Sequence, residues 1–154
     1  MSVVIGIDPG ISGAIAAFVD GKLLVAIDMP TADGTVVTSL LAEHLREFSL
    51  AGFDSRPLVV VEKVHAMPGQ GVSSMFKFGR SLGAIEGVVG ALGWPLQWLT
   101  PQAWKKHHGL INKPKDAARL LAIETWPEDA DMFRRKKDCG RADAALIACA
   151  GGPR

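Results

Sequence analysis

The first apolar segment of the chain constrains the fold most, because it is a short β-branched run that ends in a carboxylate. Residues 3–8 are Val-Val-Ile-Gly-Ile-Asp, a pattern that predicts a strand buried on both faces. Asp8 follows the last apolar residue, and open sheets place ligands at the carboxyl ends of their strands. An Asp before Pro-Gly also commonly starts or caps a turn. This segment alone therefore leaves both roles open for Asp8.

A second segment of the same kind resolves part of that ambiguity. Residues 58–61 are Leu-Val-Val-Val, and Glu62 follows them. A helix predicted between the two strands, Thr35 to Ser49, favours their parallel pairing. Asp8 and Glu62 are then expected at the same edge of the sheet.

The remaining strands complete a mixed five-stranded sheet. Residues 13–19 and 22–28 flank Asp20-Gly21, a two-residue hairpin signal, so the chain is expected to open with an antiparallel three-strand meander. Residues 29–34 are expected to form a loop, and residues 94–99 the fifth strand. A length of 154 residues suits one α/β domain over 1–150, with a flexible tail over 151–154.

A third carboxylate stands in an otherwise small, apolar helix, predicted over Arg141 to Ala150. Asp143 lies there among alanines, where an unpaired charge is costly unless it is near the helix end, paired or bound to metal. Asp138 precedes this helix. Oxygen-only ligands suit Mg²⁺ or Mn²⁺, so Asp8, Glu62, Asp138 and Asp143 together suggest a two-metal site for phosphodiester hydrolysis.

A long predicted helix, Val72 to Leu92, carries glycines spaced by four at Gly79, Gly83 and Gly87. Glycine within a helix costs roughly 1 kcal/mol relative to alanine. We infer that another backbone approaches this face, either the sheet of the same chain or the same helix of a second copy.

The rest of the chain carries two further predicted helices and most of the basic residues. Thr100-Pro101 begins a short helix in which Trp104 is expected in the core, and Lys113 to Trp126 is expected to bury Leu120 and Leu121. Residues 128–139 read as a polar loop. Ten of the 17 Lys and Arg residues lie between Lys105 and Arg141, which predicts a local basic surface despite a net charge of +1.

Composition excludes several classes of protein. No apolar run is long enough to span a membrane, and no basic region precedes an apolar stretch at the N-terminus. Two cysteines outside any CxxC pair argue against a disulfide scaffold or a zinc site of the usual spacing. We therefore expect a cytoplasmic protein, in the host cytoplasm if the source is viral.

Three motifs in this order resemble the RuvC-like Holliday-junction resolvases. They are Gly-Ile-Asp-Pro-Gly at 6–10, Val-Val-Val-Glu at 59–62 and Arg-Ala-Asp-Ala-Ala-Leu-Ile-Ala at 141–148. The resemblance also covers 74–83 and 100–105, and it is nearest to the short bacteriophage variants. It implies an RNase H-like fold, a homodimer, no nucleotide cofactor, and symmetric nicking of four-way DNA junctions. It also implies two Mg²⁺ ions per site, which Mn²⁺ can replace.

The resemblance assigns roles to individual residues. Asp8 would contact both metals, and Glu62 and Asp143 would each bind metal. The family's fourth acidic or histidine position falls on Gly140 or Cys139, so Asp138 would have to reach in from further out. The glycine-striped helix would form the dimer interface. The expected DNA contacts are His65, which replaces the family's aromatic wedge, Lys77, Arg80, Lys105, Lys106, Arg134, Arg135, Lys136 and Lys137.

Three other functions fit parts of the same sequence. A sugar-kinase-like ATPase shares the opening Asp and Gly but needs two such domains and further glycine motifs, which a chain of 154 residues does not supply. An RNase H-like nuclease acting on RNA–DNA hybrids, flaps or forks remains open. A catalytically silent junction-binding protein is disfavoured by the three intact carboxylates.

Overall fold

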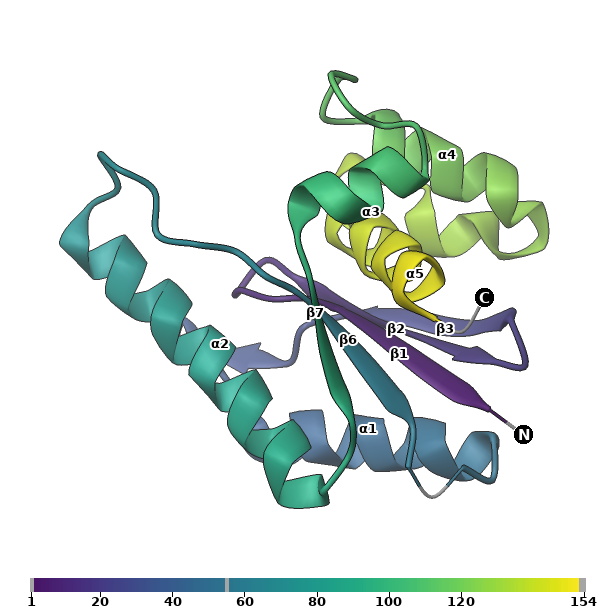
Figure 1. Cartoon of the computed structure of the whole chain (residues 1–154), viewed down its shortest axis with the longest axis horizontal. Coiled ribbons are helices and arrows are strands. Elements are labelled where there is room, and N and C mark those ends of the chain that lie inside the picture. Colours follow the sequence, from purple (N-terminus) through teal and green to yellow (C-terminus); the bar gives the residue numbers. More distant parts are fainter. Residues whose placement is uncertain (1, 55, 153–154) are drawn as a thin grey trace.

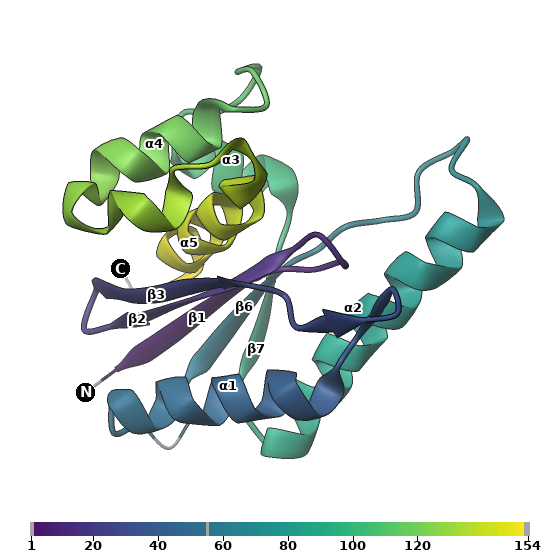
Figure 2. The same ribbon diagram turned by 180° about the vertical axis from the view of Figure 1, so that it is seen from behind.

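A five-stranded mixed sheet lies between two layers of helices in the computed structural model, which describes residues 2–54 and 56–152 (Figures 1 and 2). The strand order is β3-β2-β1-β6-β7. The strands are β1 (Val3–Asp8), β2 (Ala14–Val19), β3 (Lys22–Asp28), β6 (Leu58–Glu62) and β7 (Leu96–Leu99). The first three form the predicted antiparallel meander, and β1, β6 and β7 pair in parallel. The predicted mixed sheet is confirmed.

The helices divide between the two faces of the sheet (Figure 1). On one face lie α1 (Thr38–Ala51) and α2 (Val72–Leu92), and on the other lie α3 (Pro101–His107), α4 (Ala117–Thr125) and α5 (Cys139–Gly151). The inner strand β1 is apolar on both faces, as the continuous β-branched run requires. Ile5 and Ile7 pack toward α1 and α2, whereas the opposite face packs against the alanines of α5.

The segment after β3 differs from the expected loop and helix. A two-stranded hairpin, β4 (Thr31–Ala32) and β5 (Thr35–Val36), precedes α1, which therefore begins at Thr38 rather than Thr35. Asp33 and Gly34 form its turn with positive φ values of 51° and 71°. An Asp-Gly pair accepts these angles readily, so the same hairpin signal that joins β2 to β3 recurs here.

The region before α5 also differs from the expectation. The predicted helix from Lys113 begins only at Ala117, and its Leu120 is 55% exposed, while Arg119 is only 7% exposed. The reason is that the Arg119 guanidinium binds Asp116 and the backbone carbonyls of Phe133 and Arg134, which turns this face of α4 inward. Residues 127–133 and 136–138 form 3₁₀ helices instead of an irregular loop.

The helix α5 begins at Cys139 and includes Gly151, so it is longer than predicted at both ends. Of the expected tail, Gly152 donates its backbone N–H to Ala148, and residues 153 and 154 lie outside the described residues. Within the described ranges, no helix is both long enough and apolar enough to cross a membrane.

Candidate functional site

Two carboxylates meet at one edge of the sheet. Ile7 of β1 and Val61 of β6 form the last register pair of these parallel strands, and Asp8 and Glu62 directly follow them. The third carboxylate, Asp143, lies in α5, the helix that packs across β1 and β2. All three residues are partly buried. The parallel pairing predicted from the sequence thus brings Asp8 and Glu62 together.

The electrostatics show that all three charges act on one another. Burial raises the pKa of Asp8 well above its ordinary value, and the charges of Asp143 and Glu62 raise it further. Burial and then the charge of Glu62 raise the pKa of Asp143 to about 7. Burial also raises the pKa of Glu62, against the opposing effects of a Trp104 hydrogen bond and the Lys105 charge. Like charges held together in this way are stabilised by a cation.

The donor set fits a hard divalent cation. It consists of carboxylate oxygens, which Mg²⁺ and Mn²⁺ prefer, with no cysteine or histidine among the three side chains. In the described part of the chain, however, no three acidic, His or Cys side chains are already arranged at ligand geometry.

Asp138 occupies a different environment from the other three carboxylates. Its side chain is 1% exposed and forms an ion pair with the Arg135 guanidinium, with an Nη2–Oδ1 distance of 2.8 Å. It also accepts a hydrogen bond of 2.8 Å from the Arg135 backbone N–H. Burial opposes the charged form, but these bonds outweigh it and hold the pKa of Asp138 below its ordinary value. Its charge is not among those that raise the pKa of Asp8, Glu62 or Asp143.

Gly140, one of the two positions on which the resemblance places a fourth ligand, lies beside Asp8. A Cβ built on Gly140 would lie 3.6 Å from Asp8 Oδ2, but only 2.8 Å from the Ser12 carbonyl oxygen. A side chain at this position would have to displace the Ser12 backbone. The turn after β1 and the start of α5 therefore pack too closely for a larger residue.

Trp104 contacts one of the three carboxylates, which the sequence did not predict. It lies in the core, as expected, yet its indole Nε1–H donates a hydrogen bond of 2.6 Å to Glu62 Oε2. The signal available in the sequence was that a buried Trp needs a partner for its one N–H. Nothing in the sequence alone identified Glu62 as that partner.

Three lysines share a pocket with Asp143. Lys105, Lys113 and Lys115 line a pocket of about 180 Å³ together with Asp143. The charges of Lys105 and Lys115 lower the pKa of Asp143, against the larger opposing effect of burial. Lys105 was predicted as a DNA contact, whereas Lys113 and Lys115 were counted only as part of the basic region. Three cations beside a carboxylate site form a surface suited to phosphate groups.

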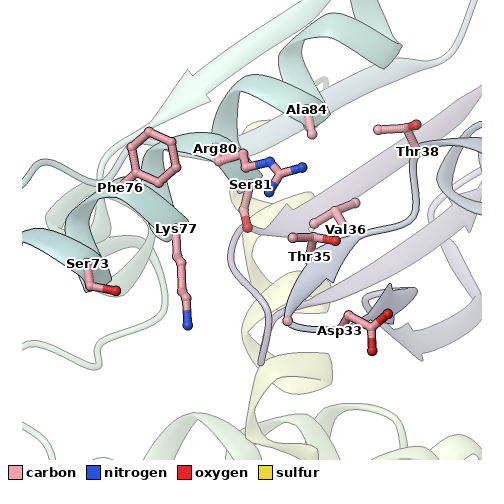
Figure 3. A pocket seen from close by; sticks show the side chains of 11 residues that line it. Asp33, Thr35, Val36, Thr38, Ser73, Phe76, Lys77, Arg80, Ser81 and Ala84 are labelled. Carbon is pink, nitrogen blue, oxygen red and sulfur yellow. The ribbon is translucent and has the colours of Figure 1, made fainter.

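Two further predicted DNA contacts, Lys77 and Arg80, line a separate cavity of about 380 Å³ between α2 and the β4–β5 hairpin. Figure 3 shows the Arg80 side chain extending from α2 toward Thr35 and Val36 of the hairpin. Phe76, whose ring is largely exposed, lines the same cavity. These basic side chains therefore share one face of α2.

The other predicted DNA contacts differ in whether an acidic side chain already pairs with them. Arg134 pairs with Asp131 at the exposed surface, and Arg135 is held by Asp138. The remaining four residues are exposed, and they are His65, Lys106, Lys136 and Lys137.

The glycine stripe of α2 does not contact the sheet. A Cβ built on Gly79, Gly83 or Gly87 meets no atom within 4 Å, and all three residues are exposed. Packing within the chain therefore does not explain these glycines. Of the two explanations that the sequence left open, contact with the sheet of the same chain is wrong.

Comparisons with known proteins agree with the fold and the motifs. No protein-family model matches the chain. Over 99 residues it is 33% identical to the chloroplastic Holliday junction resolvase MOC1 of Chlamydomonas reinhardtii, a match that covers 62% of this chain but only 11% of that protein. RuvC of T. thermophilus in complex with a Holliday junction superposes with a TM-score of 0.63 at 20% identity, covering 97% of this chain and 92% of that one. The yeast mitochondrial Holliday junction resolvase Ydc2 superposes with a TM-score of 0.56 at 15% sequence identity, covering 97% of this chain and 77% of that one. The chain has the RNase H-like fold of RuvC. Its predicted resemblance to the RuvC-like Holliday-junction resolvases is confirmed.

Proposed function

We propose that this RuvC-like chain is a metal-dependent endonuclease that resolves four-way DNA junctions by paired, symmetric nicks. The observation that carries the proposal is the group of three carboxylates, Asp8, Glu62 and Asp143, which three different elements bring to one edge of the sheet. Burial raises the pKa of each, and the charges of neighbouring carboxylates raise the pKa of Asp8 and Asp143 further. Holding such charges together without a cation is costly, so their assembly at a strand end is better explained by binding than by packing.

The three carboxylates would hold divalent cations, two per site by the resemblance. When bound, these ions polarise the scissile phosphate and lower the pKa of the attacking water. Asp138 is assigned no part in this group, because the Arg135 side chain and backbone already occupy its oxygens. The chain then contributes three acidic ligands where the sequence analysis predicted four.

The basic side chains would position the DNA. Lys105, Lys113 and Lys115 lie beside Asp143, where they can bind phosphates adjacent to the one that is cut. Lys77 and Arg80 extend the basic surface along α2. Contacts of this kind fix the register of the DNA without reading its sequence, and they make binding sensitive to salt.

A homodimer would supply the second active site that paired nicks require. The glycines of α2 leave an open strip on the outer surface of the molecule, and Met75 is partly exposed nearby on the same helix. Three glycines in one exposed helical row lower the stability of a monomer, but they permit close approach of a second backbone. We therefore infer that α2 contacts α2 of a second copy.

The deciding experiment is cleavage of labelled four-way, three-way and linear duplex DNA, with Mg²⁺ and with EDTA. We expect metal-dependent, symmetric nicks in the four-way junction and no cutting of the linear duplex. Equal cutting of three-way or forked DNA would indicate a broader branch nuclease. Tight junction binding without cutting would favour the silent junction-binding protein and contradict the proposed mechanism.

A further inference from the structure

The indole of Trp104 is fixed by packing on several sides. It is 1% exposed and belongs to a core cluster with Val60 of β6, Ala118 of α4, and Leu146 and Ile147 of α5. A ring enclosed by three elements has little freedom to rotate, since interiors are packed at crystal-like density. The direction of its N–H bond is therefore set by the core.

Both ends of α3 hold the helix in place. At its start, Thr100 accepts a hydrogen bond of 3.2 Å from the Ala103 backbone N–H, and Pro101 occupies the first turn. At its end, the His108 ring Nε2 lies 2.8 Å from the Leu146 carbonyl oxygen of α5. The helix that carries Trp104 is thus capped at its start, directly after β7, and tied at its end to the helix of Asp143.

The only polar atom of this buried ring is directed at Glu62. The Nε1–H donates to Oε2 at 2.6 Å, a short distance for a hydrogen bond to a carboxylate. Only Oε2 accepts this bond, and among residues 2–54 and 56–152 no hydrogen bond or ion pair to Oε1 is found. A long, flexible Glu side chain at a strand end otherwise has several rotamers, whereas Asp8 has fewer.

We propose that Trp104 is a positioning residue for the metal centre: it holds Glu62 by one oxygen so that the other is presented to the cation. The inference rests on the proposed nuclease function, in which the three carboxylates bind metal. What it predicts is the affinity of the protein for metal in the absence of DNA. Groups that hydrogen-bond to metal-ligating side chains commonly change affinity or activity by 10- to 100-fold when removed. The hydrogen bond from the buried Trp104 indole to Glu62 is an interaction of this kind.

The test is the Mn²⁺ affinity of Trp104→Phe, measured by electron paramagnetic resonance of free Mn²⁺ in the absence of DNA. Phe keeps an aromatic ring in the core but removes the N–H. We expect affinity to fall about 10- to 100-fold. Nicking should fall at limiting Mn²⁺ and recover at high Mn²⁺, while junction binding in Ca²⁺ stays unchanged. Trp126→Phe is the matched control, because Trp126 packs against the same cluster and should keep wild-type affinity.

A second measurement leaves Trp104 intact, in case its replacement prevents folding. The four tryptophan indole N–H resonances of the wild-type protein are followed during Mg²⁺ titration. Separate Phe substitutions of Trp94, Trp98 and Trp126 identify the Trp104 signal by elimination. We expect Mg²⁺ to shift this signal most, because the cation draws charge from the carboxylate that accepts its hydrogen bond.

The outcomes separate this inference from the proposed function. Wild-type Mn²⁺ affinity in folded Trp104→Phe, or a Trp104 resonance that Mg²⁺ leaves in place, contradicts the positioning role even if the protein cuts junctions. Weakened Mn²⁺ binding in Trp104→Phe supports the role even if no junction is cut, in which case the proposed junction-resolving function is wrong and the positioning role stands. A wild-type chain that binds no divalent cation contradicts both.

Discussion

Gly6, in the middle of β1, lies directly against the Ala144 carbonyl oxygen of α5. A Cβ at Gly6 would lie 2.1 Å from that oxygen and 2.7 Å from the Ala148 backbone nitrogen. Gly6 stands two residues before Asp8, and Ala144 directly follows Asp143. The absence of a side chain at Gly6 is therefore what lets α5 approach β1 closely enough to join two of the three carboxylates.

Gly6→Ala is expected to destabilise the fold by about 1–3 kcal/mol, because the added methyl group meets backbone atoms that cannot turn aside. Chemical denaturation followed by circular dichroism measures the loss. Gly90→Ala is the control, since a Cβ there meets nothing within 4 Å and alanine favours the helix. Equal stability of the two variants would show that α5 shifts away at little cost.

Asp8→Asn is expected to keep junction binding and to lose cleavage. The substitution preserves the size of the side chain but removes a charge from the middle of the proposed metal site. Gel-shift affinity in Ca²⁺ and nicking in Mg²⁺ measure the two properties separately. Retained nicking would remove Asp8 from the mechanism.

The metal-free protein is expected to lose stability as pH rises from about 4 through 7. The pKa of Asp143 is about 7 in the folded chain against an ordinary value of 3.8, so the folded state binds this proton more tightly. The resulting stabilisation is complete below pH 3.8 and disappears as pH rises through 7. Above pH 7 the ionised carboxylate opposes folding until a cation binds.

Two comparisons isolate this contribution of Asp143. Asp143→Asn should raise the Tm at pH 8 in EDTA by at least about 3 °C, with little change at pH 4, whereas Glu124→Gln on the exposed face of α4 should show no such trend. Mg²⁺ should raise the wild-type Tm more at pH 8 than at pH 5. An Asp143→Asn effect independent of pH would contradict the raised pKa.

Gly83→Leu is expected to convert a dimer into a monomer without unfolding the chain. The glycine faces open space in the single chain, so a leucine there meets resistance only from a second copy. Sedimentation equilibrium gives the change in association, and Glu43→Leu on the exposed face of α1 controls for an added surface leucine. A wild-type protein that is monomeric at all concentrations would refute the interface.

Lys115→Ala is expected to weaken junction binding at low salt and to reduce the slope of log affinity against log salt by about 1. Arg134→Ala should change the slope less, because Arg134 is already paired with Asp131. Fluorescence anisotropy across a salt series measures both. Equal slopes for the two variants would remove Lys115 from the DNA-binding surface.

The sequence by itself determined the elements that depend on local pattern. The β-branched runs of β1 and β6, the Asp-Gly turn between β2 and β3, and α2 from Val72 to Leu92 follow from nearest-neighbour preferences and hydrophobic spacing. Because a helix connects the strands, their parallel pairing followed too, and with it the meeting of Asp8 and Glu62 at one edge.

Only the tertiary structure decided which side chains share a contact across the chain. It directed Asp138 to Arg135, turned the glycines of α2 outward, buried Arg119 in place of Leu120, and brought the Trp104 N–H to Glu62. The Arg135–Asp138 pair is local, since its residues are three positions apart, whereas the other three depend on how elements distant in sequence pack, which no local pattern encodes. Local preferences therefore placed Asp8 and Glu62 at the ends of their strands and Asp143 within a helix, whereas packing between elements selected which carboxylates share the site.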